Sequence, residues 1–513
     1  MDRTLYLQKL DRIFRRFPSV QKCGFAKDSY KPGLEHMQAF SKLLGRPQAR
    51  LRTIHVAGTN GKGSVASMLA AALSEPGLRV GLYTSPHILD FRERMRIISP
   101  QRPALSPGCP QSRDFISPPQ RPEFISEEEV MSFLEDYESD FISLDLSFFE
   151  ITTGMAFRWF ADRGVDCAVI ETGLGGRLDS TNIITPLISV VTGIGLDHCE
   201  LLGDTRAKIA AEKAGIFKPG VPALVSVRDE ETAAVFEKAA SRVGAPLHFA
   251  DEMDARGEAW RTETLSAMDL RGDCQKENLR TVCAALQLLR PEATERDWNA
   301  MRSAIERTAA ITDFHGRWEA LSRDPLVICD IAHNPPALKV NFATLGRMLA
   351  EGECDVLIIV YGVMADKDLG AILPLMPREA EYVLVEPRSA RSMKVAQLYR
   401  RVLDFFSAAD SASPLSGVTA TPEACSAASA SGGASSETDS AASEPGGTAP
   451  LLCPVTAAGS VEEGVRAALA RAEALRSRGR RPLIYIGGST FVVAEAVGLF
   501  KKGDTQDCTS PRN

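Results

Sequence analysis

The sequence predicts an α/β protein in which helices cover both faces of parallel sheets. Short apolar, β-branched runs alternate with longer helical patterns through most of the chain, and parallel sheets require this order of elements. The expected strands are apolar throughout, as strands buried on both faces are. The predicted strands are 54–57, 80–84, 167–171, 188–192, 222–227, 326–330, 356–361, 382–386 and 483–486, and the predicted helices include 126–137, 151–161, 205–214 and 278–289.

Two stretches differ in composition from the rest of the chain. Residues 100–122 are rich in proline and polar residues, which indicates a surface insertion. Residues 407–450 consist mostly of Ala, Ser, Gly, Thr and Pro without an aromatic residue, a composition that predicts disorder. Because strand-like sequence resumes at Leu483, this segment is an insertion within a domain. We expect domains at 1–311 and 312–502, and a frayed tail at 503–513.

Composition excludes several classes of protein. A formal net charge of −7 over 513 residues argues against a nucleic-acid-binding protein, which would normally carry a basic excess. The 11 cysteines show no C-x-x-C spacing, which indicates a reduced protein. The N-terminus is charged where a signal peptide is apolar, and the longest apolar stretch, 356–364, is too short to cross a bilayer. We therefore expect a cytoplasmic monomer with no membrane or nucleic-acid partner.

A glycine-rich loop lies between an expected strand and an expected helix. Its residues are Gly58, Thr59, Asn60, Gly61, Lys62, Gly63 and Ser64. Glycines allow consecutive N–H groups to point at one anion, and the following helix adds its positive end. Lys62 would reach the outer phosphates, and Ser64 or Thr59 could face a magnesium ion. Gly63 intervenes where the common loop has Ser or Thr. A surface turn is the alternative interpretation, but the strand–loop–helix context favours nucleotide binding.

Polar residues follow several other expected strands, at the sheet edge where ligands collect. Ser85 is a turn residue or a ligand; Glu171 ends an apolar strand, and a buried carboxylate there needs a metal or an arginine partner. His198 is either a core histidine or a cation ligand. The simplest interpretation of Lys213 is a solvent-exposed lysine on a helix. Ser85, Glu171 and His198 could together complete a magnesium shell. Because magnesium prefers oxygen, His198 better suits a second cation.

The second half of the chain repeats this pattern. Asp330 and His333 follow another apolar strand, and Arg317 precedes it. Arg317 is a surface charge, or it faces a bound triphosphate and neutralises charge as phosphoryl transfer begins.

The ordered set of motifs resembles the folylpolyglutamate synthase/dihydrofolate synthase family of the Mur ligase superfamily. The resemblance covers almost the entire chain except the two insertions. The motifs that carry it are residues 58–64, 83–87, 91–94, 148–150, 171–182, 195–198, 212–216, 316–317, 330–335, 366–368 and 487–489.

The resemblance implies a fold and a reaction. ATP would lie between a larger N-terminal P-loop domain with a mostly parallel sheet and a smaller Rossmann-like C-terminal domain. ATP would phosphorylate a carboxylate, and the amine of L-glutamate would attack the acyl phosphate to form an amide. The acid would be dihydropteroate, the glutamate tail of (tetrahydro)folate, or both. The sequence of residues 146–150 resembles that of bacterial members of the family, which favours a bifunctional enzyme.

The resemblance also implies roles for single residues. The loop holds the phosphates of ATP; Ser85, Glu171 and His198 bind Mg²⁺ and a second cation; and Lys213 carries a carbamate. Further nucleotide contacts fall on Asn278, Arg317 and Asp330, although Cys274-Gln275 stands near Asn278 where the family usually has His-Gln. Pterin contacts fall on Ser147, Phe148, Phe149, Glu150, Leu178, Asp179 and Ser180. Glutamate is oriented by His333 and Ser489, and the catalytic residues are Lys62, Lys213, His198 and His333.

Three alternatives remain open at this point. The chain is a monofunctional folylpolyglutamate synthase, a related Mur-type ligase that builds a cell-wall peptide on a UDP-sugar, or a P-loop switch or kinase. A ligase for UDP-sugars would be expected to have a UDP-binding domain, and none is recognisable before Gly58. In a switch or kinase, Glu171, His198 and Lys213 would have no evident function.

Overall fold

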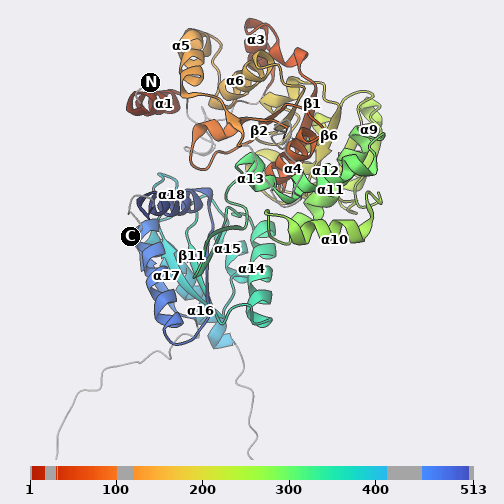
Figure 1. The fold of residues 1–513 in the computed structure, drawn as a ribbon. Coiled ribbons are helices and arrows are strands. Elements are labelled where there is room, and N and C mark those ends of the chain that lie inside the picture. Colours follow the sequence, from red (N-terminus) through yellow and green to blue (C-terminus); the bar gives the residue numbers. More distant parts are fainter. Residues whose placement is uncertain (1–2, 18–30, 32, 101–120, 413–452, 508–513) are drawn as a thin grey trace, which may run out of the picture.

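The chain forms two α/β units, each built around its own sheet. The computed structural model describes residues 3–17, 31, 33–100, 121–412 and 453–507. Figure 1 shows the first unit above the second, with α13 (Thr308–Thr312) and α18 (Thr490–Asp507) near the region where they meet. Both sheets are mostly parallel, which confirms the predicted fold class.

The first sheet has eight strands in the order β4-β3-β2-β5-β1-β6-β7-β8. Pairing is parallel from β2 through β8 and antiparallel for β3 and β4. The strands are β1 (Thr53–Ala57), β2 (Val80–Tyr83), β3 (Met95–Ile98), β4 (Glu123–Phe124), β5 (Cys167–Glu171), β6 (Ile188–Val191), β7 (Ala223–Val225) and β8 (Leu247–Phe249).

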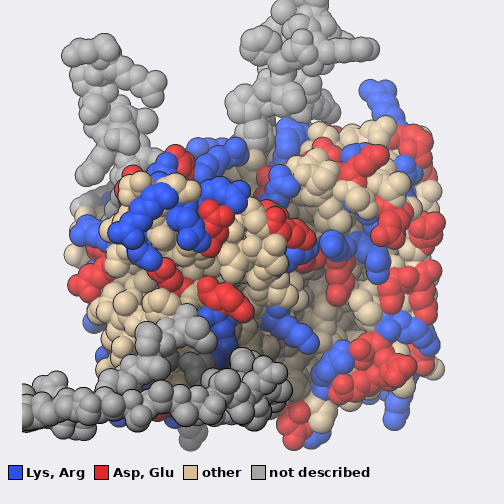
Figure 2. All heavy atoms as spheres, turned by 90° about the horizontal axis from the view of Figure 1, so that it is seen from below, with Lys and Arg blue, Asp and Glu red and all other residues tan. Residues whose placement is uncertain are grey.

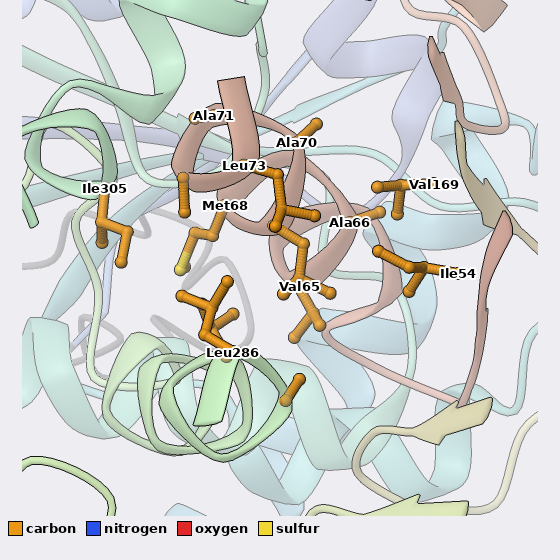
Figure 3. Packing of buried hydrophobic residues seen from close by; sticks show 14 of the residues in the cluster. Ile54, Val65, Ala66, Met68, Ala70, Ala71, Leu73, Val169, Leu286 and Ile305 are labelled. Carbon is orange, nitrogen blue, oxygen red and sulfur yellow. The ribbon is translucent and has the colours of Figure 1, made fainter. Parts of the chain in front are cut away.

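Helices cover both faces of this sheet. They are α1 (Arg3–Arg16), α3 (Glu35–Leu43), α4 (Lys62–Ser74), α5 (Glu127–Ser143), α6 (Phe148–Asp162), α7 (Cys199–Leu202), α8 (Arg206–Lys213), α9 (Ala233–Val243), α10 (Gly257–Ala267), α11 (Gln275–Leu289), α12 (Glu295–Glu306) and α13. Helix α4 is buried along its whole length after Lys62. Figure 3 shows its apolar side chains between Ile54 and Val169 of the sheet and Leu286 of α11 and Ile305 of α12. A helix enclosed in this way holds the preceding loop in a fixed position.

The second sheet has six strands in the order β13-β12-β11-β14-β10-β9, and only β9 is antiparallel. The strands are β9 (Glu319–Arg323), β10 (Leu326–Asp330), β11 (Val356–Tyr361), β12 (Ala380–Val385), β13 (Val455–Ala458) and β14 (Pro482–Gly487). Helices α14 (Pro335–Ala350), α15 (Leu369–Ile372) and α16 (Val395–Ala412) contribute to the core on one face, and α17 (Val461–Arg476) and α18 to the core on the other.

The boundaries of two expected segments lie inside helices. Helix α16 continues to Ala412, past the expected start of the insertion at residue 407; three of the residues at 407–412 are alanines, and alanine is the best helix former. Helix α18 continues to Asp507, past the expected tail start at 503. The rest of the insertion at 407–450, nearly all of the one at 100–122, and residues 508–513 lie outside the described residues.

No helix in the described part of the chain is long and apolar enough to cross a membrane. The face seen in Figure 2 carries basic and acidic side chains side by side, without a broad field of one sign.

Candidate active site

Residues 58–61 form the loop between β1 and α4, and residues 62–64 begin α4, at the carboxyl edge of the first sheet. Gly58 has φ +154° and Gly61 has φ +89°, conformations that favour glycine. A Cβ on Gly58 would lie 1.8 Å from Oγ1 of Thr192, and one on Gly61 would lie 2.3 Å from Oδ1 of Asn278. Asn278 on α11 therefore lies against the loop.

Hydrogen bonds fix the loop to the segment that follows β6. The Thr59 N–H donates to the Gly193 carbonyl at 2.9 Å, and the Thr192 hydroxyl donates to the Asn60 carbonyl at 2.6 Å. The Thr59 hydroxyl donates to the Gly195 carbonyl at 3.1 Å. The loop is thus held in shape by backbone and hydroxyl contacts.

Two lysines converge on the carbonyl of Gly58. The Lys62 ammonium donates to it at 3.2 Å and to the Thr59 carbonyl at 3.3 Å, while Lys213, at the end of α8, donates to it at 2.7 Å. Lys213 is buried, and burial, with the charge of Lys62 as the next cause, lowers its pKa to about 7. A large share of Lys213 is therefore a neutral amine near neutral pH.

Glu171 provides a buried carboxylate beside the loop. It ends β5, and its Oε2 accepts the Ser85 N–H at 3.1 Å. A Cβ built on Gly63 would lie 3.6 Å from the same oxygen. Burial raises the pKa of Glu171, and the charge of Lys62 opposes that shift. Ser85 and Glu171 therefore offer oxygen atoms of the kind that suits magnesium. In the described residues, no three His, Cys, Asp or Glu side chains form a metal-binding cluster.

Asp197 connects the two units. Its Oδ1 accepts the His198 N–H at 3.0 Å and the Lys367 ammonium at 3.2 Å, and its Oδ2 accepts the Asn334 amide at 3.1 Å. The Nε2 atoms of His198 and His333 each lie 3.7 Å from Oδ2. Burial acts to raise the pKa of Asp197, but the nearby His333, His198 and Lys367 prevail and lower it. Asp197 is therefore ionised.

Burial has the opposite consequence for His198. It lowers the pKa of this imidazole to about 4, although Asp197 opposes the shift. The ring is neutral at physiological pH, which is the form that binds a cation.

A cavity of about 240 Å³ lies between the two units. Many of the expected residues line it, from both units: Ser85, Ser147, Phe148, Phe149, Leu178, Asp179, Ser180, His198, His333 and Ser489. Four cationic side chains also line it, namely Lys31, Arg94, Lys367 and Arg391. The structure thus brings together residues more than 400 positions apart in the sequence.

Two of the expected substrate residues have other bonding partners. Glu150 does not line the cavity; its Oε2 accepts the N–H of Ser147 at 2.7 Å and caps the start of α6. Asp179 does line the cavity, but its carboxylate accepts the N–H groups of Gly173 and Leu174 at 2.9 and 2.8 Å, and that of Thr181 at 3.0 Å. These contacts shape the wall of the cavity.

Of the expected nucleotide contacts in the second unit, Arg317 precedes β9 and Asp330 lies at the carboxyl end of β10. Asp330 ends β10, where its two oxygens accept the N–H groups of Trp318 and Ala332 at 2.9 and 2.7 Å. The positive charge of Arg317 acts to lower the pKa of Glu171 against the larger effect of burial. Asn278 donates to Gln275 at 2.9 Å.

Sequence reasoning did not assign a role to Asp197, Lys367, Arg94 or Arg391. Asp197 and Lys367 belong to recognised motifs, but their contact joins two units and has no signal in sequence spacing. Arg94 is buried, donates to Nδ1 of His87 at 2.9 Å, and lies over the ring of Phe148 at 5.3 Å.

Comparison with known proteins gives consistent results. Residues 316–434 match the Mur ligase, glutamate ligase domain. The dihydrofolate synthase/folylpolyglutamate synthase of Bacillus subtilis is 34% identical over 366 residues, covering 67% of this chain and 78% of the relative. The enzyme of the same description from Mycobacterium tuberculosis is 34% identical over 394 residues, covering 72% and 77%.

Solved structures share the fold. A Mycobacterium tuberculosis folylpolyglutamate synthase complexed with ADP and AMPPCP has a TM-score of 0.70 at 24% identity, covering 97% of this chain and 99% of that one. E. coli FolC in complex with DHPP and ADP has a TM-score of 0.69 at 24% identity, covering 97% and 98%.

Proposed function

This chain belongs to the dihydrofolate synthase/folylpolyglutamate synthase family, and from that premise we propose that it joins L-glutamate to dihydropteroate and to the glutamate tail of folates at the expense of ATP. The observation that carries the proposal is the cavity between the two units, lined by Ser85 and His198 on one side and by His333 and Ser489 on the other. Ser85 links this cavity to the glycine-rich segment, because its N–H donates to Oε2 of Glu171, the oxygen that would lie 3.6 Å from a Cβ on Gly63. We also propose two domains, 1–311 and 312–502, with the boundary at the end of α13 (Thr308–Thr312).

The reaction has two steps. An oxygen of the substrate carboxylate attacks the γ-phosphorus of ATP, the bond to the bridging oxygen breaks, and ADP leaves. The neutral amine of glutamate then attacks the acyl carbon, inorganic phosphate leaves, and the amine loses a proton. Activation is needed because a carboxylate oxygen is otherwise a poor leaving group.

The loop N–H groups and Lys62 hold the phosphates of ATP. Because two anions must meet in the first step, fixed positive charge at this point lowers the barrier. Magnesium supplies further charge neutralisation when bound. The hydroxyl of Ser85 and the carboxylate of Glu171 suit it, and a buried carboxylate benefits from a cation nearby. His198 suits a second cation. Arg317, Asp330 and Asn278 complete the nucleotide site.

Lys213 carries a carbamate in the active enzyme. A lysine must be neutral to attack CO₂, and its pKa of about 7 meets this requirement. The carbamate converts a buried cation into an anion with two oxygens, beside Lys62. Protein equilibrated with ¹³C-bicarbonate should give a carbamate resonance in the ¹³C spectrum that is absent from Lys213→Met; equal spectra would contradict the carbamate.

The substrates occupy opposite sides of the cavity. Phe148, Phe149 and Leu178 supply apolar surface for a pterin ring, with Ser147 and Ser180 as polar neighbours. His333 and Ser489, from the second unit, orient the incoming glutamate. A substrate with a flat ring at one end and a carboxylate at the other would place its ring against the apolar side chains of the first unit and its carboxylate toward the second unit.

The direct test is release of phosphate from ATP. Purified protein should release it only when a pterin acid and glutamate are both present, and mass spectrometry should show one added glutamate. Dihydropteroate and tetrahydrofolate should be assayed side by side, because turnover of both supports the bifunctional enzyme and turnover of tetrahydrofolate alone supports the monofunctional one. Basal hydrolysis that no such pair changes would refute the proposal.

A further inference from the structure

Asp197 forms hydrogen bonds to two residues of the other unit, and the proposed reaction gives it no function. Its carboxylate lies in the first unit, directly before His198, and accepts hydrogen bonds from Lys367 and Asn334 of the second unit. Lys367 and His333 line the cavity, whereas Asp197 does not. Asp197 therefore has contact with the cavity only through its partners.

The orientation of Asn334 shows that position 197 must offer an acceptor. The side-chain oxygen of Asn334 accepts the Ala337 N–H at 3.1 Å and caps α14. Its amide nitrogen must therefore point the other way, where it donates to Asp197 at 3.1 Å and to Oδ1 of Asn60 at 3.1 Å. Turning the amide over would break the cap and place two nitrogens in contact.

The same contacts reach the phosphate-binding loop. Asn60 belongs to that loop, and its amide nitrogen returns a hydrogen bond to Oδ1 of Asn334 at 3.3 Å. A continuous hydrogen-bond network thus runs from Asn60 through Asn334 and Asp197 to Lys367, and Nε2 of His333 lies 3.7 Å from Oδ2 of Asp197. The network joins the loop of the first unit to Lys367 of the second unit, which lines the cavity together with His333.

We propose that Asp197 is a positioning residue that holds Lys367 and His333 of the second unit over the phosphate-binding loop, so that glutamate meets the acyl phosphate in the correct geometry. This inference rests on the proposed function. A negative charge is required because Lys367 is a cation, and the paired side chains are mostly buried, with 15% of Lys367 and 12% of Asp197 exposed. Removing one partner of an ion pair shielded in this way leaves the other charge without compensation, which costs more than the same change at the surface.

The chain offers a matched control at another contact between the units. Asp273 precedes α11, and its carboxylate accepts the Thr344 hydroxyl at 3.2 Å and lies 3.1 Å from Nη2 of Arg347, both on α14. It therefore joins the same pair of units by the same type of bond. Asp273 does not line the cavity.

The experiment compares Asp197→Asn with Asp273→Asn. Asp197→Asn should lower kcat/KM for glutamate about 10- to 100-fold, as loss of a hydrogen bond between charged groups does, while the Kd for magnesium-ATP stays within about twofold. Asp273→Asn should leave kcat/KM for glutamate within about threefold of the wild type. Unfolding midpoints of both variants establish that they fold.

A second variant keeps the proposal testable if Asp197→Asn folds poorly. Lys367→Gln should also lower kcat/KM for glutamate. The double variant should have about the same kcat/KM as the less active of the two single variants, because the two side chains act as one pair. Equal losses for Asp197→Asn and Asp273→Asn, additive losses in the double variant, or a matching loss of magnesium-ATP affinity would each overturn the proposal. Wild-type protein without glutamate-dependent turnover would instead refute the proposed function.

Discussion

Lys62 and Lys213 donate to the same carbonyl oxygen, that of Gly58, yet their environments differ. Lys62 is partly exposed at the start of α4, where an incoming phosphate can replace the carbonyls as its partner. Lys213 is buried behind the loop. Two lysines of one site thus have different chemistry, and each supports a separate prediction.

Lys62→Ala should reduce kcat by at least about a hundredfold, because charge neutralisation of this kind contributes that much in comparable sites. The unfolding midpoint should stay close to that of the wild type, since the hydrogen bonds of Lys62 within the described residues go to two carbonyls of its own loop. Phosphate release and thermal unfolding measure the two quantities. Lys208→Ala on α8, which removes an exposed ion pair with Asp204, is the control and should leave both unchanged. Full activity in Lys62→Ala would remove the lysine from the mechanism.

The low pKa of Lys213 predicts how stability depends on pH. Its native pKa of about 7 lies below the usual lysine value of 10.5, so the unfolded state binds more protons between these two pH values. Stability relative to Lys213→Met should therefore rise with pH through this window, by at most about 1.4 kcal/mol per pH unit. Urea unfolding of both proteins at several pH values, in buffer freed of CO₂, measures the difference. A difference that is constant between pH 7 and pH 10 would contradict the shifted pKa.

At the scale of elements, the phosphate-binding loop depends on the packing of its neighbours. The loop is fixed between β1, the segment after β6, and the buried helix α4. Gly58 is the point of closest approach, with the Cβ of Thr192 2.9 Å and its N–H nitrogen 3.2 Å from where a methyl group would lie.

Gly58→Ala should destabilise the fold by about 1–3 kcal/mol and abolish magnesium-ATP binding, because the end of β6 must move to admit the methyl group. Gly346→Ala is the matched control: Gly346 lies inside α14 with nothing within 4 Å of its added Cβ. That change should stabilise the protein by about 0.5–1 kcal/mol. Denaturant unfolding and calorimetry give both results. A Gly58→Ala protein that binds magnesium-ATP as tightly as the wild type would show that the loop tolerates a side chain.

The strands that the sequence predicted correctly are those made mostly of apolar residues. Strands 167–171, 326–330 and 356–361 agree with β5, β10 and β11 residue for residue. The strands that were missed, β3, β4, β8, β9 and β13, are short, lie in the outer part of a sheet, or have partly exposed patterns. A strand near an edge needs fewer apolar residues, because at least one side remains near solvent, so composition carries less signal there.

At the scale of the whole molecule, the site is made by the meeting of two sheets. Sequence indicated which residues follow strand ends, and the structure brings Ser85, His198, His333 and Ser489 to one cavity. The bonds that join the units, such as Asp197 to Lys367, depend on how the units are oriented. Nothing in local sequence encodes that orientation, so Asp197 was recognised only as part of a motif.

The segment 413–452 should be dispensable for this assembly. It connects the end of α16 to β13 (Val455–Ala458), and these two elements pack against each other in the second unit. Because the flanking elements are already adjacent, a short Gly/Ser linker closes the same loop at a small entropic difference. Replacing residues 413–452 with such a linker should leave kcat and the KM values of all three substrates within about twofold of the wild type. The unfolding midpoint should stay within about 2 °C. A selective rise in one KM would instead show that the segment contributes to binding that substrate.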